Sequence, residues 1–258
     1  MMGDFSMRFR FIETGYASAA FNMGLDEGIL NAVAEGRSEP TLRFYAWRPR
    51  AVSIGYFQGL EDEVDETACS ARGVDVVRRV TGGGAVYHAD ELTYSVVMPE
   101  SHPLAAGSIL DSYRLLCGGV VEGLKALGID AEFAPINDVV AGGKKLSGNA
   151  QTRKRGCLLQ HGTVLLGVDV DEMFALLKVP NEKLKGKLIE DVKARVSSVS
   201  DRLGRPFGYA EALSAFKLGF VKALAVNLAD GEPSPAELDD ARRLAAEKFG
   251  DRAWTAKR

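Results

Sequence analysis

Three consecutive glycines, Gly82–Gly84, follow a pair of arginines and separate two segments that are rich in strand-forming residues. Val74–Val80 precedes the glycines and Ala85–Tyr87 follows them. Because glycine has no side chain, the amides of such a turn can come close to an anion, and a neighbouring guanidinium can bind phosphate or carboxylate oxygens in pairs. The segment therefore predicts either an anion site between two strands or a hairpin turn beside two solvated arginines.

A second segment favours the anion site. Within Gly142–Gln151, Lys145 precedes the small residues Ser147, Gly148 and Ala150 in a segment that reads as a strand. An ammonium group held over small residues can contact a phosphate or carboxylate that approaches the strand. A strand lysine is more often simply solvated, so this residue alone would not identify a site.

The sequence excludes two common phosphate-binding motifs. A Walker loop would need glycine where Asp138 stands and serine or threonine where Lys145 stands. A dinucleotide-binding fingerprint would need a third glycine at Tyr87 and a following helix, but the strand-like run Leu92–Met98 follows instead.

Composition excludes several other classes of function. The 258 residues are 46% hydrophobic and 26% charged, which is an ordinary balance for a globular protein with a sizeable core. The formal charge of -3 argues against a nucleic-acid partner, and the basic run Arg153–Arg155 is typical of a solvated loop. With no signal peptide and no long apolar run, we expect a soluble, cytoplasmic protein without a membrane partner. Three scattered cysteines and three histidines predict neither a disulfide framework nor a zinc site.

The hydrophobic pattern predicts one α+β domain over residues 1–258, with a mixed, largely antiparallel sheet packed by helices. Strands are expected at Leu42–Trp47, Ala51–Phe57, Val74–Val80, Ala85–Tyr87, Leu92–Met98, Ala131–Phe133, Asp138–Ala141, Lys145–Gln151 and Leu158–Leu166. Helices are expected at Ser18–Glu35, Ala105–Leu127, Val170–Lys178, Tyr209–Ala225 and Pro235–Phe249. Gly142 and Gly143 are expected to join two of the strands as a hairpin.

Taken together, the spaced motifs resemble the lipoate-protein ligase A and octanoyltransferase family, whose catalytic domains are related to those of biotin protein ligases. The motifs that carry this resemblance are Ala20–Met23, Leu25–Glu27, Arg43–Tyr45, Gly55–Gln58, Arg78–His88, Asn137–Asp138, Lys145–Ala150 and His161–Gly162. The resemblance implies a biotin/lipoate-ligase type of fold. It also implies lipoate or octanoate as substrate and a lysine acceptor on a lipoyl-domain protein, such as the E2 of a 2-oxoacid dehydrogenase or the glycine cleavage H protein.

The family contains two chemistries. Its ligases activate the free acid with ATP and Mg²⁺ as an acyl adenylate, which needs positioning and charge stabilisation but no enzyme nucleophile. Its transferases take the acyl group from a carrier protein onto a cysteine. The resemblance implies two positions for that cysteine, which correspond here to Phe133–Asp138 and to Pro180–Asn181, and neither contains one. Cys157 lies beside Arg153–Arg155 but begins an apolar strand, where a small buried side chain is expected.

The ligase is therefore the leading interpretation, and two alternatives remain. The segments Glu91–Ser95 and Gln151–Arg153 look as much like octanoyltransferases as ligases, which keeps a cysteine-dependent transferase open. Many ligases also carry a small C-terminal domain, which would begin near Trp254. We therefore expect that this chain has no such domain and could be the catalytic half, or an accessory lipoate-binding subunit, of a two-component ligase with a separate small protein.

The resemblance also implies a role for each matching residue. Lys145 would be catalytic and would contact both the acyl carbonyl and the α-phosphate. The residues expected at ATP or the adenylate are Arg78, Gly82, Gly83, Gly84, Ala85, Val86, Asn137, Asp138 and Lys145, with Asp138 also near Mg²⁺. The residues expected at the lipoyl group are Tyr45, Val86, His88, Lys145, Gly148, Ala150, His161 and Gly162. For the two histidines, a buried structural role is the favoured interpretation.

Overall fold

The structure is a computed structural model that describes residues 7–179 and 184–257, and within them it contains two β-sheets. The larger sheet has eight strands in the order β11-β1-β2-β6-β10-β9-β8-β7. Its strands are β1 (Met7–Ala17), β2 (Thr41–Trp47), β6 (Glu91–Pro99), β7 (Glu132–Ala134), β8 (Asp138–Ala141), β9 (Lys144–Lys154), β10 (Cys157–Leu165) and β11 (Val226–Gly231). The smaller sheet has the order β4-β3-β5, with β3 (Ala51–Ile54), β4 (Asp75–Arg78) and β5 (Val86–His88).

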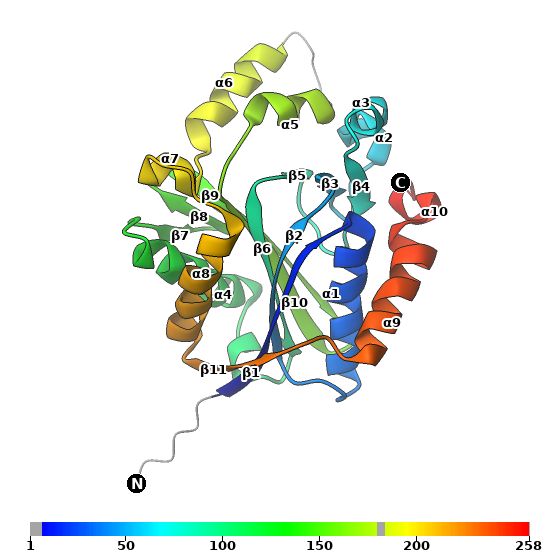
Figure 1. The fold of residues 1–258 in the computed structure, drawn as a ribbon, viewed down its shortest axis with the longest axis vertical. Coiled ribbons are helices and arrows are strands. Elements are labelled where there is room, and N and C mark those ends of the chain that lie inside the picture. The colour runs from blue at the N-terminus through cyan, green and yellow to red at the C-terminus, as the bar shows by residue number, and fades with distance from the viewer. Residues whose placement is uncertain (1–6, 180–183, 258) are drawn as a thin grey trace.

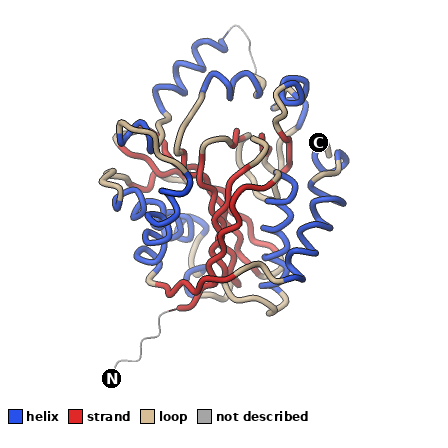
Figure 2. Tube along the Cα trace, in the orientation of Figure 1, coloured by secondary structure: helices blue, strands red, loops and turns tan. Residues whose placement is uncertain are grey.

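Helices cover both faces of the larger sheet (Figures 1 and 2). Helices α4 (Ile109–Ala126) and α8 (Tyr209–Leu224) pack on one face, and α1 (Ala19–Ala34) packs on the other with α9 (Pro235–Leu244) behind it. The remaining helical segments are the short α2 (Leu60–Glu63), α3 (Glu66–Ala71), α5 (Val170–Leu176), α6 (Lys185–Arg195), α7 (Val199–Leu203) and α10 (Arg252–Thr255), a 3-10 turn at Pro103–Ala105 and a π-helical turn at Ala245–Phe249. The expected α+β class is confirmed, and the sheet is mixed because β1 runs parallel to both β2 and β11.

The alternation of side chains along β2 divides the core from the site. Leu42 and Phe44 point into the larger core against α4 and α8, because successive strand residues face opposite sides of a sheet. Arg43, Tyr45 and Trp47 therefore face the α1 side, where all three side chains are buried. One strand thus supplies both the main core and the polar groups of the opposite face.

Close packing of α1 against α9 depends on glycine. A Cβ atom added to Gly24 would lie 2.5 Å from the carbonyl oxygen of Ala241, so no larger residue fits without movement of the helix. Ser18 caps α1 by accepting a hydrogen bond from the amide of Phe21, as the sequence predicts. The helix is buried around most of its circumference because α9 covers the side that faces away from the sheet.

A β-bulge decides which way Lys145 points. Strand β9 pairs with β8 after the hairpin at Gly142 and Gly143, and the register shifts so that Ser147 pairs with Val139 while Lys145 pairs with Val140. The extra residue, Leu146, turns into the larger core. A bulge of this kind re-aims the side chains that follow it, so Lys145 shares a face with Gly148 three residues later.

Element boundaries differ from the sequence-based expectations where local hydrogen bonds intervene. The helix expected from Ala105 begins at Ile109, because Ser108 and Asp111 form a reciprocal capping box. Strand β1 and strand β11 were not expected, since neither has a clear turn signal on both sides. The expected position Pro180–Asn181 lies outside the described residues. Within the described part of the chain, no helix is both long enough and apolar enough to cross a membrane.

Candidate active site

A cavity of about 180 Å³ lies between the larger sheet and the smaller sheet. Residues from α1, both sheets and the glycine turn line it: Met23, Tyr45, Trp47, Ser53, Arg79, Gly83, Gly84, Ala85, Val86, His88, Thr93, Asn137, Lys145, Gly148, Asn149, Ala150, His161, Gly162 and Thr163. Most of the lining is apolar, and Arg79, Lys145 and the side-chain amides of Asn137 and Asn149 add cationic and polar groups. This combination suits a ligand with an apolar body and an anionic head.

Lys145 lies over a glycine on the wall that β9 provides. A Cβ atom on Gly148 would be 2.9 Å from both Cε and Nζ of Lys145, so the absence of a side chain at Gly148 makes room for the lysine. The Nζ atom of Lys145 lies 2.7 Å from Oδ1 of Asp138, and 41% of the lysine side chain is exposed. The ammonium group is therefore fixed by one carboxylate and remains open to a ligand.

The glycine turn, residues 82–84, presents unpaired amides. Among the residues that the structure describes, the amides of Gly82, Gly83 and Gly84 donate to no other group. Two carbonyls of the turn are hydrogen-bonded, because Nη2 of Arg79 donates to the oxygens of Gly82 and Gly84 at 2.7 Å each. Gly83 has a φ of 94°, a conformation that favours glycine. Free amides beside a guanidinium form an anion-binding surface.

The two arginines before the turn have different roles. Arg78 is fully buried, and its guanidinium donates to main-chain oxygens of two remote segments: Gly55, Tyr56, Gln58, Trp254 and Thr255. It does not line the cavity, whereas Arg79 does. Burial lowers the pKa of Arg79 to about 10, which still leaves the guanidinium charged at neutral pH. The double-arginine motif therefore contributes its second arginine to the cavity and not, as we expected, its first.

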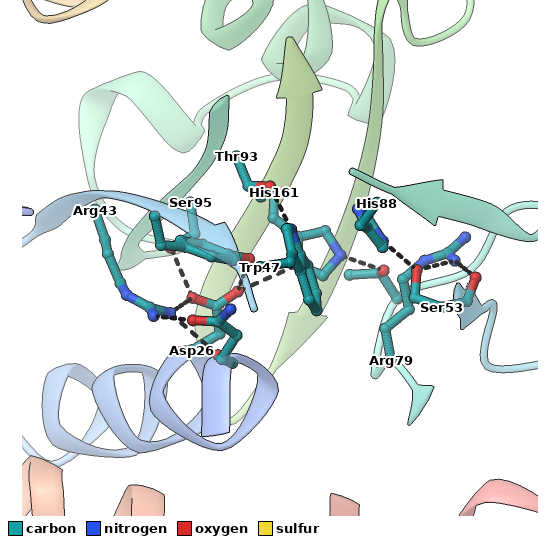
Figure 3. Close-up of polar contacts among 12 residues, drawn as sticks. Asp26, Arg43, Trp47, Ser53, Arg79, His88, Thr93, Ser95 and His161 are labelled. Carbon is teal, nitrogen blue, oxygen red and sulfur yellow. Dashed lines mark hydrogen bonds and ion pairs between the residues drawn. The ribbon is translucent and has the colours of Figure 1, made fainter. Parts of the chain in front are cut away.

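A buried carboxylate, Asp26, organises the floor of the cavity (Figure 3). It accepts hydrogen bonds from Arg43, Tyr45, Ser95 and His161 at 2.8 to 3.2 Å. Burial by itself would raise the pKa of Asp26, but the hydrogen bond from His161 and the charge of Arg43 outweigh it, so the pKa is lowered. Burial lowers the pKa of His161 against the opposing effect of Asp26, so its ring is neutral at pH 7.

A second buried carboxylate, Glu91, positions two side chains that line the cavity, His88 and Trp47. Its Oε1 atom lies 2.8 Å from Nδ1 of His88 and accepts a hydrogen bond from the indole of Trp47 at 2.9 Å. The ring of His88 stacks on the ring of Trp47, with centroids 4.0 Å apart. Both histidines are thus buried and hydrogen-bonded, as a structural role requires, and both line the cavity.

A second, largely apolar cavity of about 200 Å³ adjoins the first. The two cavities share Ala85, Val86, Lys145, Gly148 and Thr163. Beyond these residues, the second cavity extends under α5 and α6 toward Met173 and Val192. Lys145 therefore lies at the junction of two compartments, where it can contact groups bound in either one.

None of the three thiols reaches either cavity. Cys69, Cys117 and Cys157 are all buried and belong to hydrophobic clusters. Burial raises the pKa of Cys69 to about 11 and that of Cys117 to about 12, and it also raises the pKa of Cys157. A thiol with a raised pKa is a poor nucleophile at neutral pH. The neighbouring cations do not activate Cys157, because its side chain packs against apolar residues of α1 and β1.

The structure gathers most of the residues that the sequence singled out. Those that line the first cavity are Tyr45, Gly83, Gly84, Ala85, Val86, His88, Asn137, Lys145, Gly148, Ala150, His161 and Gly162. Gly82 and Asp138 lie beside lining residues without lining it themselves, and Arg78 lies apart. In the part of the chain that is described, no group of three potential metal ligands from His, Cys, Asp and Glu is present.

Sequence reasoning missed several lining residues. These are Met23, Trp47, Ser53, Arg79, Thr93, Asn149 and Thr163. A signal existed for Arg79, which belongs to the double-arginine motif, and for Asn149, which lies inside Lys145–Ala150. Trp47, Ser53 and Thr93 are ordinary strand residues, and only the packing of the two sheets shows that they meet.

Comparisons with known proteins agree with this geometry. The model of the lipoyl protein ligase A/B catalytic domain matches residues 18–221. The octanoyltransferase LipM of Anoxybacillus flavithermus is 39% identical over 272 residues, which cover 96% of this chain and 98% of LipM. A bi-partite lipoate protein ligase from Thermoplasma acidophilum superposes with a TM-score of 0.88 at 32% identity, covering 97% of this chain and 96% of that one. A lipoate-protein ligase A bound with ATP superposes with a TM-score of 0.81 at 32% identity, covering 97% and 98% of the two chains. The protein therefore belongs to the lipoyl protein ligase A/B catalytic-domain family and is an enzyme of the lipoate ligase and octanoyltransferase group.

Proposed function

We propose that the protein is a lipoate-protein ligase, which activates lipoate or octanoate with ATP and transfers the acyl group to a lysine of a lipoyl-domain protein. The observation that carries this proposal is the set of reactive groups that line the first cavity. A lysine and unpaired amides lie there, but no thiol does. A transferase that works through an acyl-cysteine needs a reactive thiolate within reach of the acyl group, whereas adenylation needs only positioned charge.

In the first step the acyl chain occupies the apolar side of the first cavity, and its carboxylate lies beside Lys145. The carboxylate oxygen attacks the α-phosphorus of ATP, the bond to the β-phosphate oxygen breaks, and pyrophosphate leaves. Lys145 stabilises the charge that develops on the α-phosphate and the acyl oxygen, and the amides of residues 82–84 bind phosphate oxygens. The nucleoside occupies the adjoining cavity, whose lining is largely apolar.

In the second step the acceptor lysine, as a neutral amine, attacks the acyl carbonyl. The bond to the phosphate oxygen breaks, AMP leaves with the electron pair, and the amine releases a proton to solvent. Lys145 again faces the leaving phosphate. The phosphates would largely hold Mg²⁺, which would offset their charge, and Asp138 and Asn137 would be the nearby oxygen donors of the protein.

The similarity to a bi-partite ligase supports a second part of the proposal. We infer that a separate small protein assists adenylation and that the acceptors are lipoyl domains, such as the E2 of a 2-oxoacid dehydrogenase or the glycine cleavage H protein. If so, this chain alone transfers lipoate from preformed lipoyl-AMP faster than it makes lipoyl-AMP from ATP. Equal rates without any added protein would show that no partner is needed.

The deciding experiment is an intact-mass assay of a lipoyl domain incubated with the purified protein. One reaction contains lipoate, ATP and Mg²⁺, and the other contains octanoyl acyl carrier protein without ATP. A mass gain with ATP supports the ligase. A gain only with the carrier protein would overturn it in favour of the octanoyltransferase, the activity that the name of the LipM relative favours.

A further inference from the structure

Two chains of buried hydrogen bonds end on the segment that carries the glycine turn, residues 79–84 (Figure 3). In the first chain, Asp26 contacts Nδ1 of His161 at 3.2 Å, and Nε2 of His161 contacts the hydroxyl of Thr81 at 2.7 Å. Thr81 is fully buried and directly precedes the three glycines. Its carbonyl is also held, because it accepts a hydrogen bond from the amide of Tyr56 at 2.8 Å.

The second chain reaches the same segment from the other side. Glu91 contacts Nδ1 of His88 at 2.8 Å, and Nε2 of His88 contacts the hydroxyl of Ser53 at 2.8 Å. Nη1 of Arg79 donates to the Ser53 hydroxyl at 3.2 Å and to the Ser53 carbonyl at 3.1 Å. Nη2 of the same guanidinium donates to the carbonyls of Gly82 and Gly84. The second chain of hydrogen bonds therefore connects Glu91 to both ends of the glycine turn.

Donor and acceptor chemistry fixes the direction of both chains. Asp26 only accepts, so the neutral ring of His161 carries its proton on Nδ1, and Nε2 must accept the proton of the Thr81 hydroxyl. Arg79 only donates, so the Ser53 oxygen accepts from it, and the Ser53 hydroxyl keeps its own proton to donate to Nε2 of His88. Each carboxylate thus contacts Nδ1 of one histidine, and Nε2 of each histidine contacts one hydroxyl.

We propose that the hydroxyls of Ser53 and Thr81 are positioning groups that hold the glycine turn in its phosphate-binding shape. The inference rests on the proposed function, because the ligand of the turn is the triphosphate. Neither hydroxyl is required to touch the reacting atoms. Their effect passes through Arg79 and through the backbone at residue 81, and it keeps the free amides of the turn in place before ATP arrives. Such preorganisation contributes to binding without adding a contact.

Matched variants at residue 81 test this inference. Thr81→Val keeps the shape of the side chain but removes the hydroxyl, and Thr81→Ser keeps the hydroxyl but removes a methyl group. Ser53→Ala interrupts the second chain. Ser112→Ala is the structural control, because it removes a buried hydroxyl that donates to Ile109 on α4 and to Gln151 on β9 and belongs to neither of the two chains of hydrogen bonds. We expect Thr81→Val and Ser53→Ala to raise the KM for ATP about tenfold, which corresponds to the loss of one hydrogen bond, with the KM for lipoate near that of the wild type.

Thr81→Ser is expected to restore the KM for ATP, and Ser112→Ala is expected to leave it unchanged. Equal increases in the KM for ATP and for lipoate, or a failure of Thr81→Ser to restore the former, would overturn the inference. A merely structural hydroxyl would lower the melting temperature, as in Ser112→Ala, without separating the two KM values.

A second readout does not need ligase activity. In ¹⁵N-labelled protein without ligand, the heteronuclear NOE of the amides of Gly82–Gly84 reports their motion on the picosecond to nanosecond timescale. We expect ordered amides in the wild type and in Thr81→Ser, and mobile amides in Thr81→Val. Unchanged NOE values in Thr81→Val would refute the positioning role. A wild type that does not use ATP would refute the ligase assignment instead, and the NOE comparison would still decide the role of the hydroxyls.

Discussion

The two polar walls of the first cavity are built in opposite ways. On the wall of the glycine turn, Arg79 and His88 are buried, and each polar atom of their side chains that approaches the turn is tied to another group. On the β9 wall, Lys145 is 41% exposed and has Asp138 as its ion-pair partner. We call the glycine-turn side, with Arg79 and His88, the braced wall, because its hydrogen bonds hold its shape before a ligand binds. We call the β9 side the lysine wall, because the exposed ammonium group of Lys145 can adjust its position to a charge that develops during the reaction. Changes to the first wall should therefore affect folding and binding, and changes to the second should affect turnover.

The largest effect is expected from Lys145→Ala, which removes the ammonium group of the proposed catalytic residue and little packing. We expect the rate of acyl transfer to fall by ~10²-fold or more, with a melting curve close to that of the wild type. The measurement is lipoyl-domain mass gain over time, with circular dichroism melting as the check on folding. Lys144→Ala is the matched control, since Lys144 lines neither cavity. Retained acyl-transfer activity in Lys145→Ala would contradict the catalytic role proposed for this lysine.

Asp26→Asn should destabilise the fold. Asp26 supports the braced wall, because it is hydrogen-bonded through His161 to Thr81 beside the glycine turn. The change leaves the buried guanidinium of Arg43 without its carboxylate, which typically costs about 3 kcal/mol or more of unfolding free energy. Asp138→Asn removes a carboxylate from a partly exposed pair, and we expect a loss of at most about 1 kcal/mol. Urea unfolding of both variants makes the comparison. Similar losses of unfolding free energy in the two variants would contradict the difference between the buried, hydrogen-bonded wall and the exposed lysine wall.

Gly148→Ala should move Lys145 without removing it. The new methyl group would lie 2.9 Å from Cε and Nζ of the lysine, and the flexible side chain would have to shift away. We expect kcat to fall about tenfold with little change in stability, because misplacing a catalytic group by about 1 Å costs up to ~10²-fold. Gly186→Ala provides the control, since no atom lies within 4 Å of the added carbon there. An unchanged kcat in Gly148→Ala would show that the lysine position is not restrictive.

Replacing Cys69, Cys117 and Cys157 together by alanine should have a smaller effect on turnover. Neither wall contains a thiol, so ATP-dependent activity is expected to stay within about tenfold of the wild type, and any loss reflects packing at the buried sites. A hydroxylamine-sensitive acyl adduct on Cys157, together with loss of turnover in Cys157→Ser, would instead place the chemistry on a cysteine.

The smallest expected effect is on the pH dependence of stability, and it comes from His161, which supports the braced wall. The pKa of His161 is lowered in the folded state, so the unfolded chain binds a proton first as the pH falls below about 6.5. The contribution of His161 to stability is therefore complete above that pH and declines below it. We expect the free energy of unfolding to fall between pH 7.5 and pH 5, with a shallower decline in His161→Gln. Parallel pH profiles for the two proteins would contradict the lowered pKa.

The sequence predicted the lysine wall better than the braced wall. Lys145, Gly148 and Ala150 lie within one short segment, so spacing along the chain is enough to bring them together. The fold class and α1 were also predictable, because hydrophobic periodicity and the Ser18 cap are local signals. Even here, the bulge at Leu146 was not visible in the sequence, although it sets the direction of the lysine.

The braced wall depends on contacts that no local pattern reveals. Ser53, Thr81, His88 and His161 come from separate strands and loops, and each looks like an ordinary polar residue in its own segment. Arg78 and Arg79 are adjacent and chemically identical, yet they face opposite directions, so only the packing on each side decides which one reaches the cavity. Cys117 and Cys157 were predictable as buried groups, because each adjoins a run of apolar residues.

Arg78 has a further consequence for the order in which the enzyme is assembled during synthesis. Its guanidinium needs the carbonyls of Trp254 and Thr255, which leave the ribosome 176 and 177 residues after the arginine itself. Until then β4 would have to bury an incompletely paired charge, which is costly, so the strand that leads into the glycine turn has no stable final position. Strand β1 likewise waits for β11 to pair with it. The final position of β4, and with it the start of the glycine turn, therefore depends on segments that are synthesised long after the strand itself.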